Sequence, residues 1–497
     1  MLKRIGKPAV RYFLLALVSV LFLLVFSAAT SSLTVCYGND SAFFILVGQG
    51  MAKGLMPYRD FFDMKGPYLF LLEYIGQLIC PGRTGAFIIQ CVNLFLCLCI
   101  IDKIYHRKKA TGSFLLWMKD CIFYILPCLY MFCHTMQGGN LTEELSLPLL
   151  LAAVYFVLKY FDAANEDHDA EHPLKYGLFY GTAFGILALI RVTNAAFIGA
   201  VLATVSLDLL LRGKFRNLLL NGAMFILGCV LAFAPMCLYY WSQGLLGEMF
   251  SQVFLFGVQY SVEVSFLFKL FSLLSSQRRI LIIMTLPLVV AALCRIKDWK
   301  YWVLSAASYL LLMVACAMGN GYLHYLTLGI PHLVLGFAGL KEWCGQKKGV
   351  KIPLIVSLLL FLLIAENVFW TTYNCRSELL NPQPSTESHQ RVLEIRDAIP
   401  EDERNSVYVY GLHSCSNWYL QADILPYNRY CDWQEHYIAL NPEIGDEILQ
   451  CLEQTPPQWI VTDAGTPVDQ YHIADVITSN YDVYMSNEAY TLYCLTD

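Results

Sequence analysis

Runs of about 20 consecutive apolar residues recur from the N-terminus to about residue 372, and this feature constrains the fold of the chain more than any other. A helix of that length is long enough to cross the hydrocarbon layer of a membrane. Only 15% of the 497 residues are charged, whereas soluble domains carry about 25%. Lipid must therefore be part of the solvent of this chain.

The pattern predicts a polytopic α-helical membrane protein with about eleven transmembrane helices and a small C-terminal α/β domain. The first predicted span follows several basic residues and is expected to be a retained signal anchor. The predicted spans are 12–30, 86–101, 121–136, 145–160, 176–190, 194–211, 217–240, 279–294, 301–317, 324–340 and 352–372. In the C-terminal domain the sequence predicts strands at 406–411, 458–463 and 488–496, and helices at 386–398 and 444–454.

Two domains are expected, with the boundary after residue 374. Residues 1–374 form a transmembrane domain that carries an outer loop at 31–85, and residues 375–497 form a soluble domain. Lys and Arg concentrate in alternate loops, such as 102–120 and 341–351, which the positive-inside rule places in the cytoplasm. The protein is then a multi-pass protein of the cell membrane, with a cytoplasmic N-terminus and an extracytoplasmic C-terminal domain.

Composition also excludes some classes of function. The chain has no basic stripe of the kind that nucleic acid requires, so no nucleic-acid partner is expected. Its 18 cysteines show no spacing with histidines that is typical of zinc sites, and most lie in apolar runs as small packing residues.

Three polar segments fall on the predicted outer face, at 36–84, 137–144 and 318–323. The first contains Asp40 just past the first span, and then Arg59, Asp60, Asp63 and Lys65 among prolines and aromatic residues. Polar groups gathered at one membrane face are where a binding site is expected. The alternative is a surface loop in which Asp60 and Asp63 pair with Arg59 and Lys65.

The second segment, MQGGNLTEELSLP, places Glu143 and Glu144 at the start of a predicted helix. Acidic residues suit the positive N-terminal end of a helix, and Asn140 or Thr142 can cap it. Capping explains at least one glutamate, and a catalytic or acceptor-orienting role is the alternative for the other.

Arg191 lies between two apolar runs at the predicted outer face, where an arginine is costly unless it is paired. A phosphate is a good partner because the guanidinium group binds its oxygens bidentately, and an ion pair with a loop carboxylate is the alternative. In the third segment Tyr322, His324 and Tyr325 are candidate phosphate or sugar contacts. A packed, hydrogen-bonded histidine is the alternative there.

Together these segments resemble the GT-C class of integral membrane glycosyltransferases. The likeness is to the bacterial branch that includes the lipopolysaccharide-core sugar transferases of rhizobia, the lipid A aminoarabinose transferases and the protein O-mannosyltransferases. It rests on Asp40 after the first helix and on the stretches GLMPYRDFFDMKGP, GGNLTEE, RVTN and YLHYLTLGIP, in that order, over about residues 12–340. Many members carry a second acid directly after the first, whereas this chain has Ser41.

The resemblance implies an inverting glycosyltransferase whose donor is a sugar on a polyprenyl phosphate. It implies that residues 1–374 are the catalytic domain and that Asp40 is the base, with Glu143 or Glu144 as a second carboxylate. Arg191, with Arg59 and Lys65, would steady the leaving phosphate. The acceptor is an envelope lipid, glycan or protein, and membrane lipids are further partners. No cofactor is certain, and a divalent cation is left open.

Two other classes of function stay open from the sequence. One is a flippase or transporter of lipid-linked sugars, although such proteins usually show internal repeats, and none is found here. The other is a non-catalytic assembly protein of the cell envelope that docks through its C-terminal domain.

Overall fold

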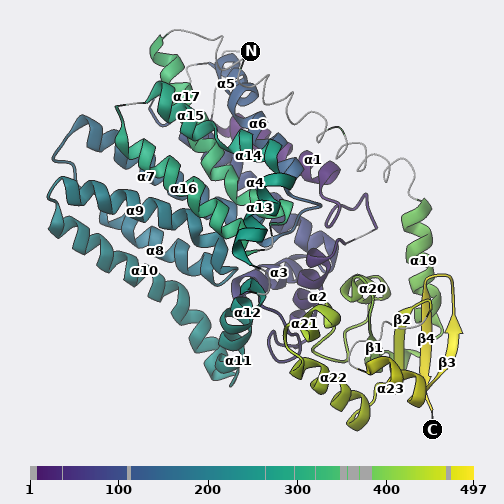
Figure 1. Ribbon diagram of the computed structural model, residues 1–497. Helices are drawn as coiled ribbons and strands as arrows, with labels where there is room; N and C mark the ends of the chain where they lie inside the picture. The colour runs from purple at the N-terminus through teal and green to yellow at the C-terminus, as the bar shows by residue number, and fades with distance from the viewer. Residues whose placement is uncertain are drawn as a thin grey trace. The chain divides into compact units, whose positions relative to one another are not determined.

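The computed structural model describes residues 8–35, 37–108, 113–262, 265–295, 297–319, 321–347, 355, 369, 383–465 and 472–496. The chain forms two compact units, each built from three segments. Unit 1 comprises Met1–Phe26, Gln90–Ser242 and Val264–Asn374, and unit 2 comprises Ser27–Ile89, Gln243–Glu263 and Cys375–Asp497. Figure 1 shows the helices of unit 1 and the mixed helices and strands of unit 2.

All the described secondary-structure elements of unit 1 are helices (Figure 1). Its helix α4 begins in the last residues of the preceding unit 2 segment. The helices are α1 (Pro8–Phe26), α4 (Arg83–Tyr105), α5 (Phe114–Asp120), η2 (Cys121–Ile125), α6 (Leu126–Thr135), α7 (Thr142–Glu166), α8 (Leu174–Ala188), η3 (Val192–Ala195), α9 (Ala196–Leu211), α10 (Phe215–Ser242), α13 (Phe266–Ser276), α14 (Arg278–Met284), α15 (Leu286–Cys294), α16 (Trp299–Met318), η5 (Leu323–Gly329) and α17 (Ile330–Lys347).

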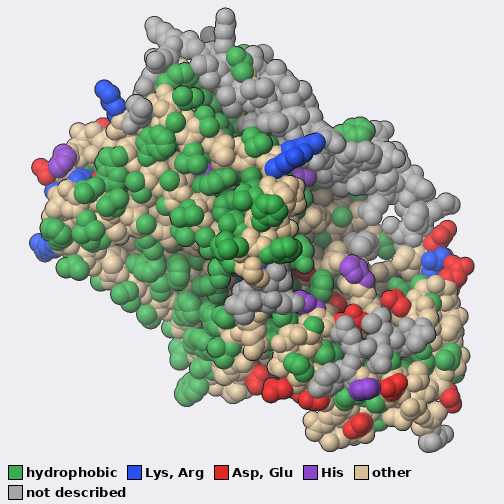
Figure 2. All heavy atoms as spheres, viewed as in Figure 1, with side chains coloured by type: hydrophobic (Ala, Val, Ile, Leu, Met, Phe, Trp, Pro, Cys, Tyr) green, Lys and Arg blue, Asp and Glu red, His purple; other side chains and the backbone are tan. Residues whose placement is uncertain are grey.

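These helices expose apolar side chains to an extent that water does not tolerate. In α10 only 17% of the most apolar stretch is buried, and Leu219, Ile226 and Leu238 are largely exposed. Figure 2 shows hydrophobic side chains spread across the described surface of this part of the protein, with few charged side chains between them. Because burial against protein does not cover this surface, lipid must.

Within the described residues, eight segments are long and apolar enough to cross a membrane. A ninth, Phe266–Ser276 with Arg278–Cys294, is bent by 87° at its break. The predicted span 176–190 corresponds to α8, which has only 15 residues, and the predicted span 352–372 lies outside the described residues except for two positions. The polytopic membrane fold predicted from the sequence is confirmed.

Glycines let α8 and α10 approach each other closely. Gly177, Gly181 and Gly185 recur every four residues along one face of α8. A Cβ at Gly181 would overlap the backbone carbonyl oxygen of Phe225 in α10, and one at Gly228 would overlap the carbonyl oxygen of Leu178. This is the small-residue packing by which membrane helices associate, since lipid offers no hydrophobic driving force between them.

Unit 2 combines helices with one four-stranded sheet. The strand order is β1-β2-β4-β3, with β1 and β2 parallel and the other neighbours antiparallel. Its elements, apart from the first residues of α4, are α2 (Asp40–Ala52), α3 (Pro67–Ile79), α11 (Leu246–Phe250), η4 (Ser251–Phe256), α12 (Gly257–Val262), α19 (Gln383–Asp397), η6 (Glu401–Ser406), β1 (Val407–Val409), α20 (Cys415–Ala422), α21 (Gln434–Leu440), α22 (Glu443–Gln454), β2 (Trp459–Asp463), α23 (Ile473–Asn480), β3 (Tyr481–Ser486) and β4 (Tyr490–Leu495).

The core of unit 2 joins residues from distant parts of the chain. Phe62 packs its ring against Phe256, Tyr430 and Tyr437, with ring centroids 5.0, 5.1 and 5.2 Å apart. Its backbone N–H also donates to the carbonyl oxygen of Arg429 at 3.0 Å. The predicted outer loop 31–85 therefore folds together with the C-terminal residues.

Candidate active site

Asp40 is the first residue of α2, after a left-handed turn at Gly38. Its side chain is partly exposed, and its carboxylate forms no hydrogen bond or ion pair with any residue that the structure describes. A partly exposed carboxylate of this kind is accessible to a ligand that approaches the start of α2.

The C-terminal residues of unit 2 border this helix end. The side chain of His413, in the loop between β1 and α20, hydrogen-bonds that of Asn39 at 3.0 Å. The side chain of Asn417 in α20 donates to the carbonyl oxygen of Gly38 at 3.5 Å. Sequence analysis missed these contacts, because a pair 374 positions apart carries no local signal.

The other charges of the same loop are paired, as the surface-loop alternative predicted. Arg59 Nη2 lies 2.8 Å from Asp60 Oδ2, and Lys65 Nζ lies 3.6 Å from Asp63 Oδ1. The backbone N–H of Met56 also donates to Asp60 Oδ2 at 2.7 Å. Burial raises the pKa of the Asp63 carboxyl group, and the neighbouring Lys65 partly offsets this. Asp60 and Asp63 thus have structural partners, whereas Asp40 has none among the described residues.

In unit 1 an unusual backbone leads into α7. Gln137, Gly138, Gly139 and Asn140 all have positive φ angles, between 43° and 95°. Glycine adopts this conformation readily, whereas it costs Gln137 and Asn140 free energy. Such strain persists only where the surrounding contacts hold the chain in place.

Glu144 provides one of these contacts. One of its carboxylate oxygens accepts hydrogen bonds from the backbone N–H of Asn140 at 2.8 Å and from the side chain of Gln90 at 2.9 Å. Neither Asn140 nor Thr142 caps the helix, because α7 begins at Thr142, and its N-cap residue Leu141 makes no side-chain cap. Glu144 instead folds back from the third helical position, in the manner of the glutamate in a capping box.

Glu143 pairs with Arg191, which directly precedes η3. Glu143 Oε1 accepts from Arg191 Nη1 at 2.8 Å, and the Glu143 side chain is almost fully buried. The Arg191 guanidinium also lies over the ring of Tyr325, 4.1 Å from its centroid. The ion-pair alternative for Arg191 is therefore realised in the structure.

Tyr325 links the pair of Glu143 and Arg191 to the candidate residues Tyr322 and His324. Its ring contacts that of His324 at a centroid distance of 4.3 Å, and His324 stacks on Tyr322 at 5.8 Å. His324 Nδ1 hydrogen-bonds the side chain of Gln137 at 3.0 Å. We call Glu143, Arg191, Tyr322, His324 and Tyr325 the Arg191 cluster. Asp40, Arg59 and Lys65 belong to unit 2.

Two further residues, Gln137 and Gly319, contact the Arg191 cluster, and sequence analysis did not identify them. A Cβ at Gly319 would lie 2.5 Å from the Tyr325 ring and 2.8 Å from Arg191 Nη2, so a larger residue would displace these side chains. The Gly-Gly pair after Gln137 was the available signal for a strained turn. Among the described residues, no group of three or more His, Cys, Asp or Glu side chains could hold a metal ion.

No protein-family model matches the sequence, and no curated protein does. Solved structures are similar over almost the whole chain. The crystal structure of ArnT from Cupriavidus metallidurans bound to undecaprenyl phosphate matches with a TM-score of 0.53 at 12% sequence identity. The apo structure of the same protein matches with a TM-score of 0.55 at 11% identity. Both matches cover 98% of this chain and 97% of the other.

This chain has the fold of ArnT. The match extends beyond the predicted resemblance over residues 12–340, because it takes in the C-terminal domain as well. At 12% sequence identity the match shows that the two proteins share the arrangement of helices and sheet. It does not show the role of any side chain.

Proposed function

We propose that this protein is a membrane glycosyltransferase that moves one sugar from a polyprenyl-phosphate-linked donor to an acceptor at the outer face of the membrane. The fold supports this class of enzyme, a membrane glycosyltransferase with a lipid-phosphate donor. The fold is shared with ArnT, whose crystal structure holds undecaprenyl phosphate. A nucleotide sugar cannot reach the outer face without transport. A sugar on a lipid phosphate stays in the bilayer and can be used there.

In the proposed reaction an acceptor hydroxyl group attacks the anomeric carbon of the donor sugar. The bond from that carbon to the phosphate oxygen breaks, and polyprenyl phosphate leaves with the electron pair. Attack opposite to the leaving phosphate inverts the anomeric configuration. A base must take the hydroxyl proton, and cationic donors must steady the phosphate.

One observation carries the assignment of Asp40 as the base. Of the acidic candidates, Glu143 is bound to Arg191 and Glu144 holds the backbone of Asn140. Asp60 and Asp63 are bound to Arg59 and Lys65. Only the Asp40 carboxylate lacks such a partner among the described residues, and it is partly exposed at a helix start. Glu143 and Glu144 then position the Arg191 cluster and do not transfer protons.

We assign Arg191 to the donor phosphate, with Tyr322, His324 and Tyr325 as neighbouring contacts. Its guanidinium is held by Glu143 and by the ring of Tyr325, so its orientation is set before any ligand binds. A guanidinium carries five N–H donors in a planar fork, and an ion pair with one carboxylate is compatible with a second contact to a phosphate. Arg59 and Lys65 have weaker support, because their charges are offset by Asp60 and Asp63.

The experiment that tests the class uses purified protein in nanodiscs with a panel of undecaprenyl-phosphate pentoses and hexoses. Envelope extract from cells that lack the gene supplies the acceptor. We expect protein-dependent release of undecaprenyl phosphate and one new glycosylated product by mass spectrometry. A flippase would leave the bond between sugar and phosphate intact. Intact donors, together with unchanged envelope lipids and glycans in cells lacking the gene, would contradict the proposal.

A further inference from the structure

A polar cleft of about 540 Å³ lies in unit 1, at the end of α7 far from the Arg191 cluster. The described residues that line it come from the segment after α4, the end of α7, the end of α15, the loop between α15 and α16, the start of α16, and α17. Asp162, beside the cleft, lies 19 residues after Glu143 in the same helix, which corresponds to about 28 Å. The cleft and the Arg191 cluster are therefore at opposite ends of α7.

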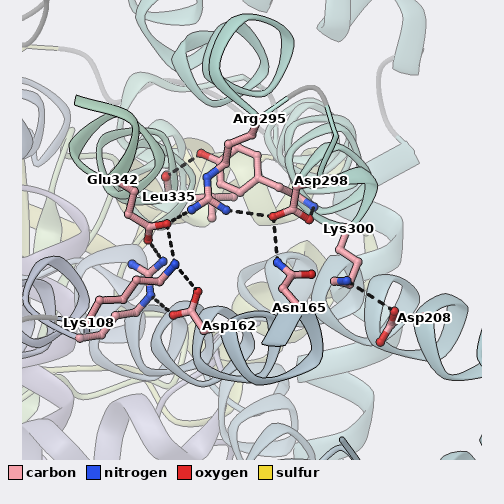
Figure 3. A network of polar contacts seen from close by, with 11 residues as sticks. Lys108, Asp162, Asn165, Asp208, Arg295, Asp298, Lys300, Leu335 and Glu342 are labelled. Carbon is pink, nitrogen blue, oxygen red and sulfur yellow. Dashed lines mark hydrogen bonds and ion pairs between the residues drawn. The ribbon is translucent and has the colours of Figure 1, made fainter. Parts of the chain in front are cut away.

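A network of ion pairs fixes the charged side chains around this cleft (Figure 3). Glu342 in α17 accepts from Arg107, from Lys108 at 2.9 Å and from Arg295. Asp162 accepts from Lys108 and from Arg107, each at 2.8 Å. Arg295 also lies 2.9 Å from Asp298. Ion pairs thus join the segment after α4, the end of α7, the loop between α15 and α16, and α17.

Positive charge exceeds negative charge in the lining. Four cationic residues, Lys108, Arg295, Lys297 and Lys300, face two carboxylates, Asp298 and Glu342. Lys297 is exposed and forms no hydrogen bond or ion pair with the residues that the structure describes, and the side chain of Lys108 is 47% exposed. Lys300 Nζ lies 3.9 Å from the carboxylate of Asp208. That carboxylate also pairs with Arg212 Nη1 at 3.2 Å. When the neighbouring Arg107, Arg212, Asp162 and Asp208 are counted as well, six described cations meet four carboxylates, so an excess of about two positive charges remains around the cleft.

The cleft also has the features of a membrane interface. Trp299 and Trp343 line it, and tryptophan is enriched where the headgroups of lipids lie. It opens at the ends of apolar helices that are long enough to cross a membrane, α7, α16 and α17. Basic pockets between transmembrane helices are suited to anionic lipid headgroups. A volume of about 540 Å³ is ample for a phosphate with its glycerol group.

We propose that this cleft binds a phosphate-bearing anion at the membrane surface, namely the headgroup of an anionic phospholipid. Lys297 and Lys108 contact the phosphate oxygens, while Arg295 and Glu342 hold the walls in place. A soluble phosphate ester has the same chemistry and is the other source. The proposal does not depend on the glycosyltransferase activity, because it concerns the other end of the helices.

The test is native mass spectrometry of protein released from nanodiscs of phosphatidylcholine with phosphatidylglycerol. We expect the wild-type protein to retain one phosphatidylglycerol and Lys297→Gln to retain about fivefold less. This factor corresponds to about 1 kcal/mol for one lysine near an anionic surface. Lys297→Arg should restore retention. Lys175→Gln is the matched control, since Lys175 is another exposed lysine of unit 1 outside the cleft.

A second arm distinguishes the two sources. Thermal stability is measured in nanodiscs of phosphatidylcholine alone, with and without glycerol 3-phosphate. If glycerol 3-phosphate stabilises the wild type and Lys175→Gln but not Lys297→Gln, and phosphatidylglycerol is not retained, the site takes a soluble phosphate ester. If Lys297→Gln and Lys175→Gln match the wild type in both measurements, the cleft is only a structural ion-pair network and the proposal is wrong. Lys297 is exposed, so its variants are expected to fold.

Discussion

At the scale of single residues, Asp40 and Asp60 form a natural comparison. They lie in the same segment of unit 2, but Asp60 is bound to Arg59 and to the backbone of Met56, while Asp40 has no such partner among the described residues. Asp40→Asn keeps the size of the side chain but cannot take a proton. We expect a rate about 10²–10⁴-fold lower in single-turnover transfer, as for removal of a general base.

The matched control is Asp60→Asn, which should keep a rate within a few-fold of the wild type. Both variants must first elute as folded protein in gel filtration. If Asp40→Asn transfers sugar at nearly the wild-type rate and Glu143→Gln is inactive, then Glu143 is the base and the assignment of Asp40 is wrong.

Arg191 gives a second prediction at this scale. Arg191→Lys keeps a positive charge beside Glu143 but loses the planar fork that binds a phosphate bidentately. We expect the KM for the lipid donor to rise about tenfold, in line with the loss of one charged hydrogen bond of about 1.5 kcal/mol. The measurement is the dependence of the initial rate on donor concentration.

Glu143→Gln separates this role from a structural one. If Arg191 serves only as the partner of Glu143, both variants should lower the thermal stability of the protein by similar amounts. The donor KM would then be unchanged in each, and Arg191 would have no part in phosphate binding.

At the scale of elements, the contact between α8 and α10 depends on the absence of side chains. Gly181→Ala would place a methyl group against the carbonyl oxygen of Phe225, and backbone cannot move aside as a side chain can. We expect a loss of about 1–3 kcal/mol, as for other overpacked positions. Gly222→Ala in α10 is the control, because nothing lies within 4 Å of its added Cβ.

Alanine is also the better helix former, so Gly222→Ala should leave stability unchanged or raise it by up to about 1 kcal/mol. The measurement is the fraction of monodisperse protein after heating in detergent. Equal stability of both variants would show that α8 and α10 can separate without cost.

The elements also show what the sequence could and could not predict. Long apolar runs predicted the helices of unit 1 because lipid sets their length. Strands β1, β2 and β4 were predicted from alternating residues, whereas the sequence analysis missed β3 (Tyr481–Ser486) and the short helices α20, α21 and α23. Helices of eight residues or fewer complete about two turns and carry little periodic signal, and β3 is an edge strand whose side chains are mostly exposed.

The same distinction holds for the candidate site. Arg59 and Asp60 are neighbours in sequence, so their pairing could be predicted from the sequence. For Arg191 the sequence indicated an ion pair with some loop carboxylate as one alternative. It did not identify Glu143 as the partner, because the two residues lie 48 positions apart. The bond between Asn39 and His413 joins segments that only folding brings together.

At the scale of the whole molecule, the membrane topology depends on whether α8 crosses. Its 15 residues extend about 22 Å, less than the hydrocarbon thickness of about 30 Å. If α8 crosses, the loop after α7 and the loop at 212–216 lie on the same side. Arg212, Lys214 and Arg216 are then cytoplasmic, as the positive-inside rule requires. If it does not cross, every later loop is inverted.

We therefore predict that α8 crosses, and that residues 375–497 are extracytoplasmic. A cysteine-free background carries one cysteine at a time, at the exposed positions His168, Arg216 or Glu401. An impermeant maleimide should label Glu401→Cys in intact cells, and should label His168→Cys and Arg216→Cys only after the membrane is opened.

His168 precedes α8 and stays inside in either arrangement, so it controls for leakage. Labelling of Arg216→Cys in intact cells, with His168→Cys protected, would show that α8 does not cross. The C-terminal domain would then be expected on the cytoplasmic side, where it could not act on an acceptor at the outer face.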